Sequence, residues 1–210
     1  MFLTCLVQFL KQKMKIIKPI PLEYVEYDFL KAEWYKSFFN PVRGKFKHLI
    51  ENPDFSNSEH NRLRRELLWA WRRPLLQRLP NNISWFLASL DEGDFSELFI
   101  IREIGWETTF GNTKKLKDVA TAILDGIEDK GVGFDLIEAI KKQIGVQPFR
   151  EKLLVISTNL QGPYTVVEGN HRAVAFHKQL IETNNASHLP KEVYLGTSSL
   201  MHISPWLNFN

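Results

Sequence analysis

The feature that most constrains the fold is a change of hydrophobic period within residues 164–183. The run 164–167, YTVV, is β-branched and aromatic, which is typical of a strand. Apolar residues then recur at helical spacing, at Ala173, Val174, Phe176 and Leu180. Glu168-Gly169-Asn170 lies between the two patterns and predicts a strand-to-helix turn, in which Gly169 is free to adopt a positive φ angle.

The surrounding segments alternate in the same way. Apolar runs predict strands over 83–90, 152–158 and 191–197, besides the one at 164–167. Helical periodicity predicts helices over 116–127, 134–144 and 171–183, and residues 91–106 indicate a turn, a helix and a strand. Strands that alternate with helices favour an α/β (α+β) domain with a mixed sheet and flanking helices.

The first 80 residues have a different pattern. Helical fragments over 24–50 are interrupted at Asn40-Pro41 and Gly44, and the polar stretch 51–61 offers Ser and Asn residues as helix N-caps. A helix follows over 62–79, and Pro74 is expected to kink or end it. We therefore expect a mainly helical extension over 1–80 and a second unit over 81–210, together forming one compact body.

Composition excludes several classes of protein. The chain has 210 residues, 44% hydrophobic residues and a net charge of +3, which suit an ordinary globular protein. The single cysteine, Cys5, excludes an internal disulfide framework. The apolar run around it lacks the flanks of a signal peptide and is too short to span a bilayer, so we expect a cytoplasmic protein without membrane contact. Met14 offers an alternative start, which would make 1–13 an extension or a short packed strand.

The turn at 168–172 carries the main functional signal. A helix N-terminus presents unpaired backbone N–H groups and favours an anion. His171 and Arg172 oppose the helix dipole there, which is reasonable if a phosphate binds between them. The alternative is structural: Asn170 as an N-cap, His171 as a surface residue and Arg172 as an ion-pair partner of Glu168.

The loop Glu168-Gly169-Asn170-His171-Arg172 resembles that of the ParB/sulfiredoxin-like superfamily, over roughly residues 83–198. It is closest to the Asp-Gly-His-His-Arg loop of the free serine kinases in that group. Sulfiredoxins have Cys where Asn170 stands, and the stretch after Arg172 is too short for the DNA-reading and dimer domains of partition proteins. The AMP-transferase loop of Fic proteins is also similar, but Tyr164 replaces its catalytic His.

The resemblance implies a ParB/sulfiredoxin-like fold and a nucleotide site for ATP or ADP. By position, Gly169, Asn170, His171 and Arg172 would hold phosphate oxygens, and Glu168 would act in catalysis or bind Mg²⁺ through water. His171 is also a candidate catalytic residue. A second catalytic acid is expected among Glu103 and Glu107, although both residues are also compatible with a solvated helix face.

Two classes of function follow. The first is a small-molecule phosphotransferase or a nucleotide hydrolase, as the kinase-like loop implies. The second is a nucleic-acid-binding module or a nuclease, because six arginines interleave with Trp69 and Trp71 over the helix Arg62–Arg78. An amphipathic helix with an arginine-rich solvent face would have the same sequence pattern. The chain shows no His/Cys cluster with zinc spacing.

Overall fold

The computed structural model describes residues 14–146, 149 and 151–208. Its centre is a mixed five-stranded sheet in the order β1-β2-β5-β3-β4. The strands are β1 (Lys15–Pro19), β2 (Ser84–Ser89), β3 (Leu153–Ser157), β4 (Thr165–Glu168) and β5 (Glu192–Thr197). Among these described strands, only β3 and β5 pair in parallel, and the other three pairings are antiparallel.

Helices precede, interrupt and follow the strands. The α-helices are α1 (Leu22–Glu33), α2 (Asn40–Phe46), α3 (His48–Glu51), α4 (Ser58–Leu76), α5 (Glu92–Ser96), α6 (Ile104–Phe110), α7 (Leu116–Leu124), α8 (Phe134–Lys141) and α9 (Asn170–Thr183). Short 3₁₀ helices are η2 (Ser37–Phe39), η3 (Ala186–His188) and η4 (Ser199–Ile203). No helix in the described part of the chain is both long and apolar enough to cross a bilayer.

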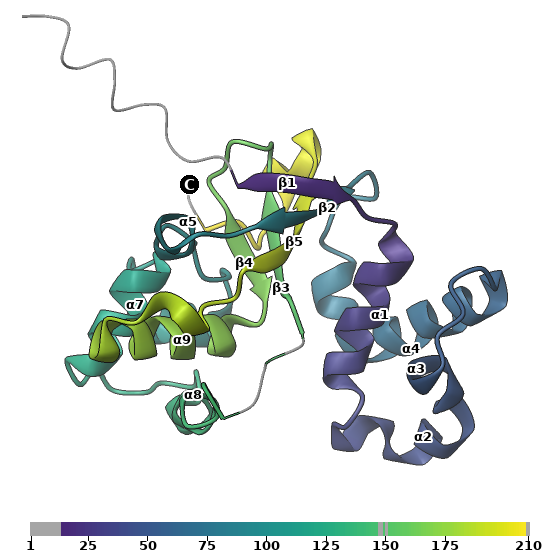
Figure 1. Ribbon diagram of the computed structural model, residues 1–210, viewed down its shortest axis with the longest axis horizontal. Coiled ribbons are helices and arrows are strands. Elements are labelled where there is room, and N and C mark those ends of the chain that lie inside the picture. Colours follow the sequence, from purple (N-terminus) through teal and green to yellow (C-terminus); the bar gives the residue numbers. More distant parts are fainter. Residues whose placement is uncertain (1–13, 147–148, 150, 209–210) are drawn as a thin grey trace, which may run out of the picture.

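The helices lie on both faces of the sheet. Figure 1 shows α1–α4 together on one side of the strands and α7–α9 on the other. Consecutive residues of β3 face these two groups, as the pleat requires. Leu154 lines an apolar groove together with residues of α1 and α4, whereas Leu153 lies against the start of α9. All three positions 153–155 are buried, so the sheet contributes to the core on both faces.

Most of the predicted elements are confirmed. The strands predicted over 83–90, 152–158, 164–167 and 191–197 and the helices predicted over 116–127, 134–144 and 171–183 are present within a few residues of their expected ends. The α/β organisation with a mixed sheet and flanking helices is therefore correct. The expected N-cap before the arginine-rich helix is also confirmed, because the Asn57 side chain accepts hydrogen bonds from the N–H groups of Glu59 and His60.

The strands differ from the prediction in two places. The strand expected within 91–106 is absent: Phe99 forms single bridges to Lys115 and Thr165, but no ladder extends from them. The chain instead turns into α6 at Ile104. Conversely, β1 was not predicted, because its lysine-rich sequence KIIKP has little hydrophobic signal and it pairs on one side only, with β2. The suggestion of a packed strand within 1–13 lies outside the described residues.

The kink predicted from Pro74 is confirmed. Pro74 lies inside α4, and Arg72 two residues earlier has non-helical angles, φ −113° and ψ 21°. Proline lacks the N–H that would bond to the carbonyl one turn back, and its ring crowds that carbonyl. The distortion places Arg72 where α4 passes the end of β4.

Candidate functional site

Gly169 allows the chain to turn from β4 into α9. Its φ angle is +91°, so the positive φ predicted from the sequence is confirmed. A Cβ atom at this position would lie only 2.6 Å from Leu153 Cδ2 and 3.0 Å from Arg172 Nη2. Both the backbone conformation and the close packing therefore require glycine here.

Asn170 connects the loop to a distant segment. Its side-chain Oδ1 accepts a hydrogen bond from the Ile101 N–H at 3.0 Å, and the residue is 7% exposed. The alternative interpretation of Asn170 as the helix N-cap is therefore wrong. Gly169 occupies the cap position without a side-chain bond, and the amide of Asn170 fixes the segment before α6 against the loop.

His171 is held by contacts on one edge of its ring. Its Nε2 lies 2.7 Å from the Val132 carbonyl oxygen, to which it can only donate. The ring centroid is 5.3 Å from that of Trp106. This hydrogen bond occupies Nε2 and leaves Nδ1 as the ring nitrogen available to a ligand.

Arg172 is also partly engaged with the protein. Its Nη1 donates to the Glu151 carbonyl oxygen at 2.7 Å and lies 4.0 Å from the Glu151 carboxylate. Its side chain is 13% exposed. The alternative that Arg172 pairs with Glu168 is wrong, because the ion-pair partner of Glu168 is Arg72, whose Nη2 lies 3.8 Å from Glu168 Oε2.

The loop forms one wall of a cavity of about 550 Å³. Residues 168–172 all line it, together with α1, α4, α6 and α8 and the segment after η4. The first three amides of α9, at 170–172, have no partner within the helix, as at any helix start. The cavity has aromatic, basic and acidic walls: Trp71, Trp106, Phe149 and Trp206; Lys36, Arg72, His171 and Arg172; Glu33, Glu103, Glu151 and Glu168.

The pKa of Glu168 is shifted by its surroundings in this cavity. Burial raises its pKa, and the nearby carboxylate of Glu33 raises it further, whereas Arg72 and Arg172 lower it. Glu33 is 4% exposed and accepts hydrogen bonds from Arg72 Nη2, at 3.0 Å, and from Trp71 Nε1. Glu168 is thus a carboxyl group with a raised pKa that lies beside the guanidinium group of Arg72, an environment typical of a general acid or base.

The two other candidate acids differ in position. Glu103, immediately before α6, lines the cavity with an exposed side chain. Glu107 is not among the lining residues, and it pairs with Arg102 Nε at 2.8 Å. The structure thus brings Glu103, but not Glu107, to the same cavity as Glu168.

A metal site made only of protein side chains is not present in the described residues. They contain no group of three or more His, Cys, Asp or Glu residues arranged to hold a metal ion. Glu168 would therefore have to bind Mg²⁺ together with oxygens of a ligand, which is the usual arrangement for Mg²⁺ with nucleotides.

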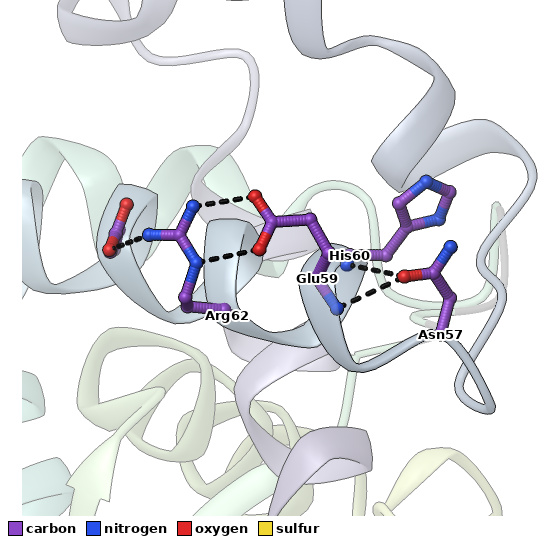
Figure 2. A network of polar contacts seen from close by, with 5 residues as sticks. Asn57, Glu59, His60 and Arg62 are labelled. Carbon is purple, nitrogen blue, oxygen red and sulfur yellow. Dashed lines mark hydrogen bonds and ion pairs between the residues drawn. The ribbon is translucent and has the colours of Figure 1, made fainter.

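The arginines of α4 are largely occupied by protein partners. Figure 2 shows the guanidinium group of Arg62 bound to the carboxylate of Glu59, and it also pairs with Glu66. Arg65 pairs with Glu26 on α1 at 2.7 Å, and Arg72 pairs with Glu33. These carboxylates neutralise much of the charge expected to attract a nucleic-acid backbone.

The remaining arginines of this segment are divided between core and surface. Arg64 is 1% exposed, donates to the carbonyl oxygens of Leu49 and Asp54, and lies 5.0 Å from the centroid of Phe55. Arg73 and Arg78 are exposed, and Arg78 lies over the ring of Trp206 at 5.2 Å.

Sequence reasoning missed the residues that come from the N-terminal helices. Glu33, Trp71 and Arg72 line the cavity opposite the loop, about 100 residues or more away along the chain. The only signal was the Arg-Arg-Pro sequence at 72–74, which marks a kink but not the residue that the kink faces.

Comparison of the chain with protein-family models, with curated proteins and with solved structures found no match.

Proposed function

We propose that the protein binds a nucleotide, ATP or ADP, through its phosphates at the start of α9. The observation that carries this proposal is the position of the loop: the free amides at 170–172 and the side chain of Arg172 lie at the wall of a 550 Å³ cavity. Amides at a helix N-terminus and a guanidinium group are both favourable partners of phosphate oxygens. A cavity of this size is within the usual range for small-molecule sites.

The aromatic wall supports a nucleotide rather than inorganic phosphate alone. Trp71, Trp106 and Trp206 line the same cavity as the loop. Trp71 is partly exposed and its ring can stack on a nucleobase, whereas Trp106 and Trp206 are buried and contribute apolar surface behind it. The combination of a phosphate cradle and aromatic side chains in one cavity is what a nucleoside phosphate requires.

The proposed reaction is phosphoryl transfer to a small molecule, or hydrolysis of the nucleotide. Phosphoryl transfer depends on neutralising charge and on orienting the nucleophile. Glu168, with its raised pKa, would orient and deprotonate the acceptor hydroxyl or a water molecule, and it would share Mg²⁺ with the phosphates when the metal binds. Glu103 on the rim is the second candidate acid, and His171 would contact phosphate through Nδ1.

The resemblance to ParB/sulfiredoxin-like proteins, and to the free serine kinases among them, supports the same proposal. The loop sequence lies at a strand-to-helix turn, and α7 and β3 precede it in the order expected for that fold. The proposed fold family and the proposed ligand class therefore agree, and both depend on the loop 168–172.

Calorimetric titration with ATP, ADP and CTP, with and without Mg²⁺, tests binding. Arg172→Ala should weaken nucleotide binding by about 1.5–3 kcal/mol, the usual value of a charge-assisted hydrogen bond. Arg62→Ala is the matched control, because Arg62 lies on the surface of α4 in ion pairs with Glu59 and Glu66. Equal affinities of wild type and Arg172→Ala would remove Arg172 from the site.

Nucleic-acid binding or nuclease activity through the segment Arg62–Arg78 is the alternative proposal. It is supported by the exposed side chains of Trp69, Arg73 and Arg78, but weakened by the ion pairs of Arg62, Arg65 and Arg72. Salt separates the two proposals, because binding to a nucleic-acid backbone weakens steeply as salt rises. Binding of a fluorescent single-stranded oligonucleotide at low and moderate salt provides this measurement.

A further inference from the structure

The contacts of Arg72 hold its guanidinium group at the cavity but do not use all of its N–H donors. Its Nη2 donates to Glu33 Oε1 at 3.0 Å, and the guanidinium carbon lies 5.4 Å from the centroid of Trp71 and 5.9 Å from that of Phe29. Within the described residues its Nε is buried and has no hydrogen-bond partner. The side chain is 36% exposed and lines the cavity.

Arg72 lies close to the loop that leads from β4 into α9. Glu168 ends β4, and its Oε2 lies 3.8 Å from Arg72 Nη2. Arg172 acts on the same carboxyl group from α9, on the other side of the turn at Gly169. Glu168 is therefore paired with an arginine of the kinked helix α4, whereas Arg172 of the loop contacts Glu151 and lines the same cavity.

We propose that Arg72 is a second phosphate-binding residue of this site, and that it contacts a phosphate group beyond the one held at the start of α9. This inference rests on the proposed nucleotide binding. It assigns the N-terminal helices a part in the site: α4 supplies the arginine, and Glu33 of α1 positions it. It also implies that a nucleoside monophosphate lacks a contact that ATP and ADP make.

The positive charges that line the cavity support an extended anion. A phosphate group bound at the amides of 170–172 would already have Arg172, on the same helix, as its countercharge. Arg72 lies beside Glu168 with a partly exposed guanidinium group, and it matches a further phosphate group of the same ligand. Planar guanidinium groups bind phosphate in a forked geometry, which a lysine does not reproduce.

The experiment measures the affinities of ATP and AMP for wild type, Arg72→Gln and Arg72→Lys by calorimetry. Arg72→Gln retains a hydrogen-bonding side chain toward Glu33 but has no charge, and we expect it to weaken ATP binding about tenfold or more. AMP has a single phosphate, so its affinity should change less than about threefold. Arg72→Lys, which keeps the charge, should give an intermediate loss for ATP.

Arg65→Gln is the matched control. Arg65 lies on the same helix, pairs with Glu26 of α1 as Arg72 pairs with Glu33, and does not line this cavity. Its substitution should leave both affinities unchanged. Thermal melting of each variant shows whether it is folded, and Arg72→Lys keeps the test valid should Arg72→Gln unfold.

The outcomes separate the inference from the function on which it rests. Loss of ATP affinity in Arg72→Gln with AMP affinity retained supports the inference. If ATP binding depends on Arg172 but not on Arg72, or if Arg72→Gln weakens ATP and AMP equally, the inference is overturned while the nucleotide site stands. If the wild-type protein binds neither nucleotide, the proposed function fails, and the role of Arg72 fails with it.

Discussion

The carboxyl group of Glu168 pairs with the guanidinium group of Arg72, and burial raises its pKa. Glu168→Gln keeps the shape of the side chain but removes its charge and its capacity to accept a proton. If Glu168 acts on the nucleophile, ATP turnover should fall by about 10²-fold or more, whereas ATP affinity should change little. Phosphate release and calorimetry on the same preparation measure the two effects.

The control for this prediction is Arg172→Ala, which should lose affinity as well as turnover. A Glu168→Gln variant as active as wild type, in an assay where Arg172→Ala is inactive, would leave the loop as a phosphate cradle only. Glu103 on the cavity rim would then be the candidate acid.

Substitution of Gly169 tests the geometry of the loop independently of any ligand. Gly169→Ala places a Cβ atom at a φ of +91° and 2.6 Å from Leu153 Cδ2, so we expect a loss of about 1–3 kcal/mol in the free energy of unfolding. Gly44→Ala is the control, because Gly44 lies in α2 with no atom within 4 Å of the added Cβ. Alanine there should stabilise by up to about 1 kcal/mol. Urea unfolding followed by tryptophan fluorescence gives both values, and similar changes in the two variants would contradict the argument.

His177 makes stability depend on pH. It lies on α9, is 5% exposed and has no hydrogen-bond partner on either ring nitrogen within the described residues. Burial lowers its pKa, and Lys117 lowers it further, whereas Asp118 and Glu92 raise it. The unfolded chain therefore takes up a proton first, below a pH of about 6.5, and this uptake favours unfolding.

We expect His177→Phe, which keeps a ring next to Phe95, to lose less stability than wild type between pH 7.5 and 5.5. The difference should grow by at most about 1.4 kcal/mol per pH unit. Urea unfolding at several pH values provides the measurement. The exposed His202 is the control, and His202→Asn should retain the wild-type slope. Parallel slopes for wild type and His177→Phe would exclude His177 as the source.

At the scale of elements, α9 is held to α8 by a partly buried ion pair. Lys178 is 5% exposed, and its Nζ pairs with Glu138, which also lies 3.4 Å from Lys141. Glu138→Gln leaves a buried ammonium without its countercharge. A fully buried pair costs about 3–5 kcal/mol when broken, and the partial exposure of Glu138 reduces our expectation to about 1–3 kcal/mol.

Glu59→Gln is the matched change on a surface pair. Arg62 retains Glu66 as a partner in this variant, so the free energy of unfolding should change much less than in Glu138→Gln. Denaturant unfolding of both variants makes the comparison. A Glu138→Gln variant as stable as Glu59→Gln would show that Lys178 finds another partner or water.

At the scale of the whole molecule, contacts join the N-terminal helices to the rest. β1 precedes α1 and pairs with β2 in the central sheet. Tyr194 of β5 donates to Asp28 of α1, and Trp206 Nε1 donates to the Leu75 carbonyl of α4 at 2.9 Å. The groove between these parts is lined by apolar residues from both.

These contacts predict a single cooperative unfolding transition. Urea curves from tryptophan fluorescence and from far-UV circular dichroism should coincide, because neither part can lose its structure without exposing the shared core. A saturating ligand such as ATP should shift both curves together. Two separate transitions, with only one shifted by ATP, would show that the N-terminal helices unfold independently of the site.

Local sequence determined the strand-to-helix turn, the positive φ of Gly169, the cap at Asn57 and the kink near Pro74. Each depends on backbone sterics or on the period of apolar residues within a few positions, so no distant contact is needed to predict it. The same information placed residues 168–172 at the start of a helix, where an anion is favoured.

Tertiary structure alone decided which residues surround that turn. Asn170 bonds to the backbone of Ile101, His171 to Val132, and Glu168 meets Arg72 rather than Arg172. The partners are separated by 39 to 69 residues in the two hydrogen bonds, and by more in the ion pair. Such contacts depend on how helices pack on the two faces of the sheet, and hydrophobic period shows only that a helix has a buried face, not which side chains it will meet.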